Sequence, residues 1–577
     1  MPLHPSVEER LARLAPDQRA AATAPPGPVL CVAPAGSGKT TTLVARIAWL
    51  VASGTPPGQT CAVTFNKRAA DELRDRVAKA LEPLGGDRDA VRIRSRDDGR
   101  EGTSQGSLGP PRNGVRVRTF HALAREILLD AGCLVDPLLD RAAVLRALGG
   151  ELPAAEFRRL DDAFSRLKLD LAVDTADLAA QVAAADARGD PAGPVIRAFL
   201  RYEAALADRG GLDFDDLVRH SIRALESDAD LLARWRSRCA ELLVDEVQDV
   251  DRSQLRLARL LAAPDNRIFL VGDDDQTIYA WRLADVRRVL DLAAALPGLR
   301  RVDLVTNYRC PPVVVERAVR LVEHNRERFE KVIRAGPAAS GRLLLLPDPG
   351  DDVARARRLL REWPAPPGET RAVLARTNAE LAPYAAVALE LGLPYRAEDD
   401  GLLLDDPGID DLLATIADAD RGTSRAAAGA SRPISLMERL LVARRDAGPD
   451  GVGVAASLLA WAPGHRDAAA LHAAIDEARA RRAEIRRDDA SLVLATAHGT
   501  KGLEFDHVAV VGMDDGRFPS RRSVEESDDP ARTFEEERRL AYVAWTRARR
   551  SLTLVYDPDA PSPFLAEAFS PAELRGR

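Results

Sequence analysis

Two stretches of the chain combine residue types and spacings that suit phosphate chemistry. The first, residues 33–40 (APAGSGKT), follows a short apolar run and precedes a helix-like pattern. Glycines let the backbone curl so that successive N–H groups point at one anion. The helix N-terminus adds partial positive charge, and Lys39 adds a full one. Although Ala33 stands where the strict pattern has glycine, the stretch predicts a phosphate-binding loop between a strand and a helix.

The second stretch is an acid pair, Asp245-Glu246, at the end of the apolar run 241–244. A phosphate loop and a strand-end acid pair together indicate a nucleoside triphosphatase. Asp245 is then expected to hold Mg²⁺, directly or through water, with the hydroxyl of Thr40. Glu246 is expected to orient or deprotonate the attacking water. The alternative is an acid pair that only caps a helix. The combination predicts ATP hydrolysis with Mg²⁺.

Short apolar runs that alternate with amphipathic helical patterns must position these groups, and they predict a parallel α/β sheet. The expected strands are residues 29–32, 61–65, 115–119, 241–244 and 267–271. In such sheets the reactive groups lie beyond the carboxyl ends of the strands. The phosphate loop and two acidic clusters, residues 245–246 and 273–275, fall there.

Two segments interrupt this pattern. Residues 82–114, rich in Gly, Asp, Arg, Ser and Pro, predict a flexible insertion. Its arginines either track a phosphate backbone or belong to a solvated loop, which is the favoured interpretation. Residues 136–208 have helical periodicity and predict a small helical subdomain.

A second series of strands follows, without a phosphate loop of its own. The expected strands are residues 302–305, 371–374, 492–495, 508–511 and 552–555, with a helix over 534–549 before the last. A linker over 421–434 and a helical stretch over 435–488 are expected inside this unit. A unit without a nucleotide site suggests one site shared across an interface, to which it supplies arginines such as Arg309 and Arg547.

Composition limits the class of protein. The net charge is −7, so a polyanion must be met by a local basic track and not by a global field. The five cysteines form no Cys-x-x-Cys pair, which argues against a zinc site or a disulfide framework and for a cytoplasmic location. No apolar run approaches the roughly 18 residues of a membrane helix, and residues 1–10 do not resemble a signal peptide.

Lysine is scarce in this chain, because arginine dominates its 82 basic residues. The lysines are Lys39, Lys67, Lys79, Lys168, Lys331 and Lys501. A lysine in so arginine-rich a chain hints at a need for a compact ammonium group. Lys39 and Lys501 fall inside motifs described here.

The motifs, taken together and in order, resemble the UvrD/Rep/PcrA type of superfamily 1 DNA helicase. The resembling stretches are Gln18 (Q motif) and residues 33–40 (motif I), 63–65 (Ia), 119–121 (Ib), 244–249 (II), 272–282 (III), 307–309 (IV), 498–505 (V) and 535–547 (VI). Motif III is the most diagnostic, because Asp-Asp-Gln joined to Tyr-x-Trp-Arg is not a general feature of phosphate-loop proteins. Motif Ia departs from the usual pattern, since Arg68 takes the place of a lysine.

The resemblance implies a role for each matching residue. The implied catalytic residues are Lys39, Asp245, Glu246, Gln276, Arg309 and Arg547, with Gln276 as γ-phosphate sensor and the arginines as fingers. Those implied to bind nucleotide are Gln18, Ala35, Gly36, Ser37, Gly38, Lys39, Thr40, Thr41, Tyr308 and Glu504. Thr40 and Asp245 are implied to bind Mg²⁺. Those implied to lie along single-stranded DNA are Phe65, His121, Tyr279, Trp281 and His498, where aromatic rings suit a motor indifferent to sequence.

The implied fold is α/β, with two RecA-like parallel-sheet motor domains and helical insertions. The expected domains are 1–127 with 209–300 (first motor), 128–208 (helical subdomain), 301–420 with 489–560 (second motor), 421–488 (reduced accessory domain) and a tail, 561–577. The accessory domain regulates unwinding in the family, so translocation is the firmer expectation. The short tail argues against a RecB-like helicase–nuclease.

The expected activity is an ATP-dependent helicase or single-strand translocase, 3′→5′ as in relatives, acting in repair or replication. Its expected partners are single-stranded DNA, duplex junctions and repair or replication proteins, with no membrane. Three alternatives stay open: a DNA-stimulated ATPase that strips proteins from single strands, a silent DNA-binding scaffold, and an RNA-directed motor. The intact Lys39, Asp245, Glu246 and Arg547 speak against the scaffold.

Overall fold

The chain folds into two compact units in the computed structural model, Met1–Thr306 with Glu327–Ile333 and Asn307–Arg326 with Arg334–Arg577. The structure describes residues 2–85, 114–149, 154–169, 192–280, 283–363, 366–397, 407–426, 435–446, 465–480 and 487–575, with single positions between 178 and 182 and between 454 and 462. Trp281 and nearly all of the insertion expected at 82–114 therefore lie outside the described residues.

The first unit is built on a six-stranded parallel sheet in the order β3-β2-β4-β5-β1-β6. Its strands are β1 (Val29–Val32), β2 (Thr60–Thr64), β3 (Arg116–Thr119), β4 (Glu241–Val244), β5 (Ile268–Gly272) and β6 (Arg300–Asp303). Because all strands run the same way, the loops that follow them meet at one edge of the sheet. The phosphate loop follows β1, and the acid pair follows β4.

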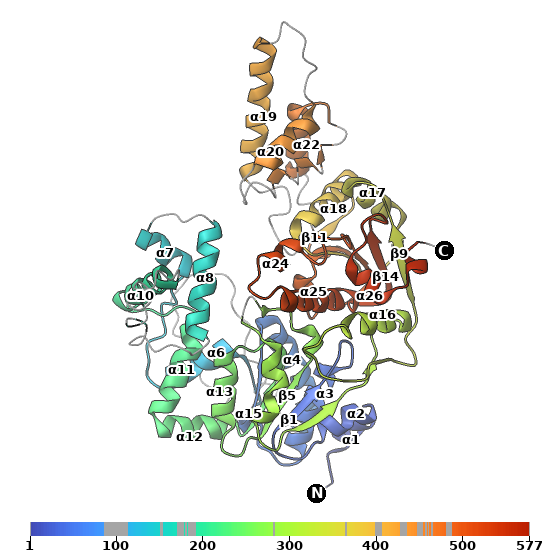
Figure 1. Cartoon of the computed structure of the whole chain (residues 1–577). Coiled ribbons are helices and arrows are strands. Elements are labelled where there is room, and N and C mark those ends of the chain that lie inside the picture. Colours follow the sequence, from blue (N-terminus) through green and yellow to red (C-terminus); the bar gives the residue numbers. More distant parts are fainter. Residues whose placement is uncertain are drawn as a thin grey trace. The chain divides into compact units, whose positions relative to one another are not determined.

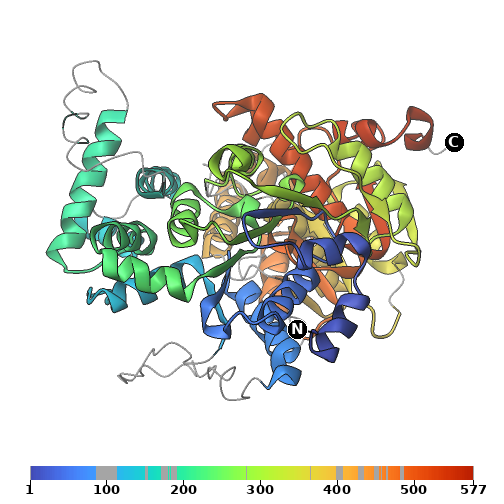
Figure 2. The same ribbon diagram turned by 90° about the horizontal axis from the view of Figure 1, so that it is seen from below.

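Helices cover both faces of this sheet (Figures 1 and 2). Alternate residues of each strand belong to different hydrophobic clusters, Val29 and Cys31 to one and Leu30 and Val32 to the other. One face packs against α1 (Pro5–Ala12), α2 (Pro16–Ala22), α3 (Lys39–Ala52) and α4 (Lys67–Leu81). The other packs against α6 (Phe120–Asp130), α11 (Asp216–Ser227), α12 (Ala229–Arg238), α13 (Arg252–Ala262), α14 (Val286–Leu290) and α15 (Leu292–Ala295). Both faces are buried, as apolar strands without polar alternation require.

A separate group of helices interrupts the first unit, as the helical periodicity predicts. These helices are α7 (Arg141–Gly149), α8 (Ala154–Leu169) and α10 (Ala192–Asp208). They share a core of their own, in which Phe164 packs against Phe199 and Tyr202.

The second unit also contains a six-stranded parallel sheet, in the order β11-β12-β10-β13-β14-β9. Its strands are β9 (Arg342–Pro347), β10 (Arg371–Ala375), β11 (Tyr395–Ala397), β12 (Leu492–Thr496), β13 (Phe505–Val510) and β14 (Ala548–Tyr556), and the short strands β7 (Thr306–Asn307) and β8 (Arg334–Ala335) precede them. Its helices are α16 (Pro312–Val322), α17 (Asp352–Glu362), α18 (Asn378–Glu390), α19 (Pro407–Ala426), α20 (Leu436–Asp446), α22 (Ala468–Ala480), α24 (Arg521–Glu525), α25 (Pro530–Trp545), α26 (Pro563–Ala568) and α27 (Pro571–Leu574). The α/β fold with two RecA-like parallel sheets is thus confirmed.

Three expectations about this part of the chain are wrong. The strand near Val302 does not open the second unit, because β6 pairs with β1 in the first sheet. The helix expected to reach residue 549 ends at Trp545, because strand β14 begins at Ala548 and pairs with β13. The linker expected from residue 421 begins inside α19, which continues to Ala426 and accommodates Gly422 at a cost of about 1 kcal/mol.

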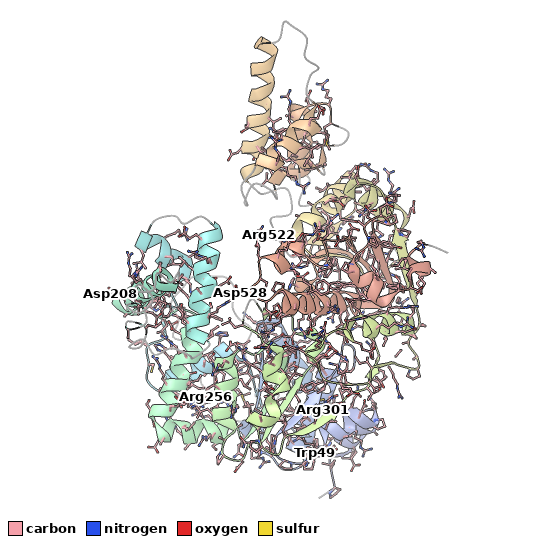
Figure 3. The ribbon with its side chains drawn as sticks, in the orientation of Figure 1. Trp49, Asp208, Arg256, Arg301, Arg522 and Asp528 are labelled. Atoms are coloured by element: carbon pink, nitrogen blue, oxygen red, sulfur yellow. The ribbon has the colours of Figure 1, made fainter. Side chains whose placement is uncertain are left out.

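Exposed ion pairs occur on both units, as Arg256 with Glu226 and Arg522 with Glu526 illustrate (Figure 3). Among the described residues, no helix combines the length and the apolar character needed to cross a membrane.

Candidate functional site

The loop after β1 has the shape of an anion cradle. Gly36 and Gly38 both have positive φ angles, 68° and 84°, which glycine adopts without strain. The turn places Lys39 at the first position of α3, and Thr40 and Thr41 follow in the first turn. The hydroxyl of Ser37 is buried and has no hydrogen-bond partner within the described part of the chain. A buried, unpaired donor at a helix N-terminus suits an anionic ligand.

Gln18 lies directly against this loop. Its side-chain amide donates a 2.8 Å hydrogen bond to the carbonyl of Ser37, and its Oε1 accepts one from the backbone N–H of Ala15. A Cβ atom at Gly38 would lie 2.6 Å from Gln18 Nε2, so a larger residue at this position would displace Gln18. Position 38 therefore needs glycine for both its backbone angle and its space.

The acid pair after β4 meets the phosphate-loop lysine. Lys39 Nζ lies 2.9 Å from Glu246 Oε2. Glu246 has a φ angle of 51°, a conformation that costs a non-glycine residue energy and that clusters at functional sites. Burial and the adjacent Glu246 raise the pKa of Asp245 to about 7, although Lys39 opposes this. Burial disfavours the charge on Lys39, but Glu246, Asp273 and Asp245 outweigh it and raise the Lys39 pKa.

These residues fit a nucleoside triphosphate with its Mg²⁺. The ammonium of Lys39 is held by a carboxylate, whose oxygens have the chemistry of phosphate oxygens. Asp245 is a buried acid whose charge a cation would stabilise, and Mg²⁺ binds through one or two carboxylates together with substrate phosphates. Thr40 and Asp245 are the residues that would hold it.

Polar side chains connect this acid pair to the loop after β5. Gln248 donates a 2.6 Å hydrogen bond to Glu246 Oε2 and accepts one from the backbone N–H of Asp273. Gln276 Nε2 in turn donates to Asp273 Oδ2 at 2.6 Å. Gln276 is buried and follows strand β5, which lies between β4 and β1 in the sheet. Its expected role between nucleotide and DNA stays a prediction.

Two aromatic pairs lie at the ends of neighbouring strands of the same sheet. Phe65, just after β2, stacks on Tyr279 with ring centroids 5.5 Å apart and an interplanar angle of 17°. His121, just after β3, stacks on Phe214 at 4.0 Å and 24°. Phe214 is 56% exposed. Phe65, Tyr279 and His121 were expected to contact DNA, whereas the sequence analysis missed Phe214.

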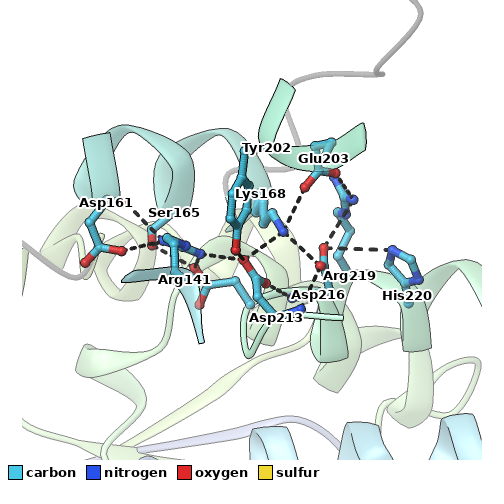
Figure 4. A network of polar contacts seen from close by, with 11 residues as sticks. Arg141, Asp161, Ser165, Lys168, Tyr202, Glu203, Asp213, Asp216, Arg219 and His220 are labelled. Carbon is cyan, nitrogen blue, oxygen red and sulfur yellow. Dashed lines mark hydrogen bonds and ion pairs between the residues drawn. The ribbon is translucent and has the colours of Figure 1, made fainter. Parts of the chain in front are cut away.

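Asp213 and Asp216, close to Phe214 in the sequence, contact side chains of the helical group of the first unit (Figure 4). Lys168, whose side chain is fully buried, lies 2.8–2.9 Å from carboxylate oxygens of Asp213, Asp216 and Glu203. Arg141 bridges Asp213 and Asp215 at 2.9 and 2.7 Å. These contacts fix the backbone on both sides of Phe214 while leaving its ring exposed. The alternation of one aromatic with three acids at 213–216 is the signal that could have identified it.

In the second unit, the structure brings Arg309, Glu504 and Arg547 together. Arg309 Nε lies 2.6 Å from Glu504 Oε2. Burial alone would raise the pKa of Glu504, but the positive charges of Arg309 and Arg549 outweigh burial and lower it. Arg547 is buried in the turn after α25 and donates to the carbonyls of Val543 and Leu503. Tyr308 precedes Arg309 and is 48% exposed. That these residues meet a nucleotide stays a prediction.

His498, in the turn after β12, is held in its neutral form. Burial lowers its pKa to about 3, and the positive charges of Arg376 and Lys501 add to the effect. Its expected contact with DNA must therefore be made by a neutral imidazole at physiological pH.

This shift predicts how stability depends on pH. In the unfolded chain the histidine binds a proton as pH falls through about 6.5, whereas folded His498 stays neutral until about pH 3. Protonation thus favours the unfolded state, and stability is lost as pH falls. The wild-type protein should lose free energy of unfolding between pH 7 and pH 5, and we expect this loss to be about 2 kcal/mol smaller in the His498→Gln variant. Urea unfolding of both proteins at the two pH values measures this, and equal losses would contradict it.

The comparisons with known proteins agree with this geometry. A model of the UvrD/REP helicase N-terminal domain matches residues 14–297, and one of the UvrD-like helicase C-terminal domain matches residues 467–558. The chain is 32% identical to ATP-dependent DNA helicase UvrD2 of Mycobacterium tuberculosis, over 94% of this chain and 78% of that protein. It is 28% identical to DNA helicase II of Escherichia coli, over 93% of this chain and 84% of that protein.

Proposed function

The chain belongs to the UvrD/Rep helicase family, and we propose that it hydrolyses ATP to move along single-stranded DNA and to separate strands at duplex junctions. One observation carries the proposal. A single sheet edge bears the phosphate loop and acid pair after β1 and β4 and the aromatic pairs beside β2 and β3. The loop after β5, a strand that lies between β4 and β1, carries Gln276 and also Tyr279, which stacks on Phe65 beside β2. This loop therefore connects the nucleotide residues with the aromatic residues.

Each residue of the site has a role in this reaction. Thr40 and Asp245 would hold Mg²⁺, which would neutralise charge on the phosphates. Lys39 binds phosphate oxygens, and Glu246 orients the attacking water and accepts its proton. Nucleotide would replace Glu246 as the partner of Lys39, which frees the carboxylate to act on the water.

Other residues extend the proposal to the second unit and to the nucleotide base. Arg309 and Arg547 supply positive charge to the transferred phosphoryl group. Tyr308 stacks on the adenine, Gln18 hydrogen-bonds it, and Glu504 lies near the ribose. These roles rest on the family's motif pattern.

The proposed contacts with bases of the single strand are made by aromatic and histidine side chains, namely Phe65, Tyr279, His121, Phe214, Trp281 and His498. Replacing Phe65 by alanine should weaken single-stranded DNA binding roughly 5- to 150-fold, since a stacked base contributes about 1–3 kcal/mol. Fluorescence anisotropy with an oligothymidylate measures this. Phe65→Trp keeps a stacking ring and should bind within about twofold of wild type. An unchanged affinity for Phe65→Ala would remove this ring from the DNA track.

The direction of movement and the biological role are finer proposals. We propose 3′→5′ movement in DNA repair or replication, with repair or replication proteins as partners. Duplexes with a 3′ or a 5′ single-stranded tail distinguish the polarity, because only the 3′-tailed duplex should be unwound. Unwinding of the 5′-tailed duplex alone would reverse the assignment.

A second candidate is a DNA-stimulated ATPase that displaces proteins from single strands without efficient unwinding. This candidate rests on the reduced accessory domain expected at residues 421–488, of which the structure describes the helices α20 and α22. Release of a protein bound to a tailed oligonucleotide, without strand separation, would favour this candidate.

A further inference from the structure

A continuous chain of polar contacts starts at the phosphate loop. Lys39 contacts Glu246 at 2.9 Å, and Gln248 donates to Glu246 at 2.6 Å. Gln248 accepts from the backbone N–H of Asp273 at 3.0 Å, and Gln276 donates to Asp273 at 2.6 Å. The carboxylate of Asp273 thus accepts the hydrogen bond that holds the side chain of Gln276.

The same carboxylate is held from its other side by Lys331. Lys331 Nζ lies 3.0 Å from Asp273 Oδ1 and 2.8 Å from Asp275 Oδ2, and it also contacts Asp274. The side chains of all four residues are fully buried. Arg328 adds two hydrogen bonds to Asp275, of 2.9 and 3.0 Å. Three buried carboxylates therefore face two cations, an arrangement that leaves little freedom for any of them.

Lys331 belongs to a segment with an unusual course along the chain. Residues Glu327–Ile333 pack in the first unit, whereas the residues before them, Asn307–Arg326, and after them, from Arg334, belong to the second unit. The neighbouring Val332 is 53% exposed, so the lysine side chain enters the core from a surface segment. Burial disfavours its charge, but the three aspartates outweigh burial and raise the pKa of Lys331.

We propose that Lys331 is a positioning residue that fixes Asp273, and through it Gln276, from a segment continuous at both ends with the second unit. A displacement of the segment Glu327–Ile333 would therefore move Lys331 and with it the Asp273 carboxylate, which holds Gln276. Lys331 would thereby tie phosphate sensing to the relative movement of the units. The inference rests on the proposed function, in which Gln276 senses the γ-phosphate and couples it to DNA.

The test compares steady-state ATP turnover with and without single-stranded DNA. Lys331→Met alone leaves buried acids uncompensated, so the main variant is Lys331→Met/Asp274→Asn, which removes one positive and one negative charge. We expect kcat with DNA to fall roughly 10- to 100-fold, as misplacement of a catalytic group does, with the KM for ATP and the DNA affinity within about twofold of wild type. Asp273→Asn keeps the size of the side chain and should show the same loss.

Two further variants separate positioning from a general effect on folding. Adding Gln276→Ala to the main variant should cost nothing beyond Gln276→Ala alone, because both act through one group. Arg301→Gln is the matched control, since Arg301 holds the same segment through the Glu330 carbonyl at 2.8 Å and does not contact Asp273. It should keep wild-type turnover.

Wild-type turnover in the main variant, or losses that multiply with Gln276→Ala, would overturn the positioning role. If the main variant does not fold, Asp273→Asn and its combination with Gln276→Ala decide the question in the same way. Failure of the proposed function looks different, because wild-type protein itself would then show no stimulation by DNA.

Discussion

Glu246→Gln should lower ATP turnover at saturating single-stranded DNA by roughly 10²- to 10⁴-fold, the contribution typical of a general base. Glutamine keeps the size of the side chain and can still contact Lys39, but it cannot accept a proton from the attacking water. The KM for ATP should change little, because the phosphate loop and Lys39 are untouched. Phosphate release under steady-state conditions measures both constants.

The matched control for this variant is Glu226→Gln, the same change at an exposed residue whose partner, Arg256, is itself 55% exposed. It should leave turnover and stability unaltered, because exposed ion pairs contribute at most about 1 kcal/mol. If Glu246→Gln kept turnover near the wild-type value, the water-activating role would belong to another residue.

Lys168→Met should lower the free energy of unfolding by about 3–5 kcal/mol, the usual cost of removing one partner of a buried ion pair. The ammonium of Lys168 is fully buried among Glu203, Asp213 and Asp216, so its loss removes one of the cations that balance these buried acids and leaves Arg141 and Arg219 to do so. Because two of these acids flank Phe214, affinity for single-stranded DNA should fall as well. Urea unfolding followed by circular dichroism measures the first effect, and anisotropy measures the second.

Lys79→Met is the control, since Lys79 is exposed on α4, and a surface change there should alter stability by less than about 0.5 kcal/mol. Pairing Lys168→Met with Asp216→Asn should recover part of the loss, because one uncompensated charge is removed. A loss below about 1 kcal/mol for Lys168→Met would mean that the network adapts without its lysine.

The strands and the phosphate site could be predicted because the signals are local. An apolar run followed by Gly-x-Gly-Lys or by Asp-Glu fixes both the element and the group at its end, as β1 and β4 show. Strand β6 was assigned to the wrong sheet because its own residues do not say which strand it pairs with. That choice is made by long-range packing against β1.

The supporting contacts were out of reach for a different reason. The ion pairs of Lys168 and Lys331 are made with aspartates that lie far away in the sequence, so they can be identified only in the folded chain. The scarcity of lysine carried a weak signal, and the side chains of Lys39, Lys168 and Lys331 are all largely or fully buried. A compact ammonium contacts three carboxylates at once, which the planar guanidinium of arginine does less readily. Strand β11 was missed because its three residues are too few to show a pattern. Strand β9 was missed although its four consecutive leucines give an apolar run like those of the predicted strands.

The measurement that tests the central claim most directly is ATP turnover without nucleic acid, with single-stranded DNA and with single-stranded RNA, using Lys39→Ala as the blank. A motor that uses the sheet edge described above should be stimulated strongly by DNA, weakly or not at all by RNA, and should lose turnover in the Lys39→Ala variant. Turnover that is independent of nucleic acid would mean that hydrolysis is not coupled to DNA, and it would contradict the proposal that this protein is a DNA motor.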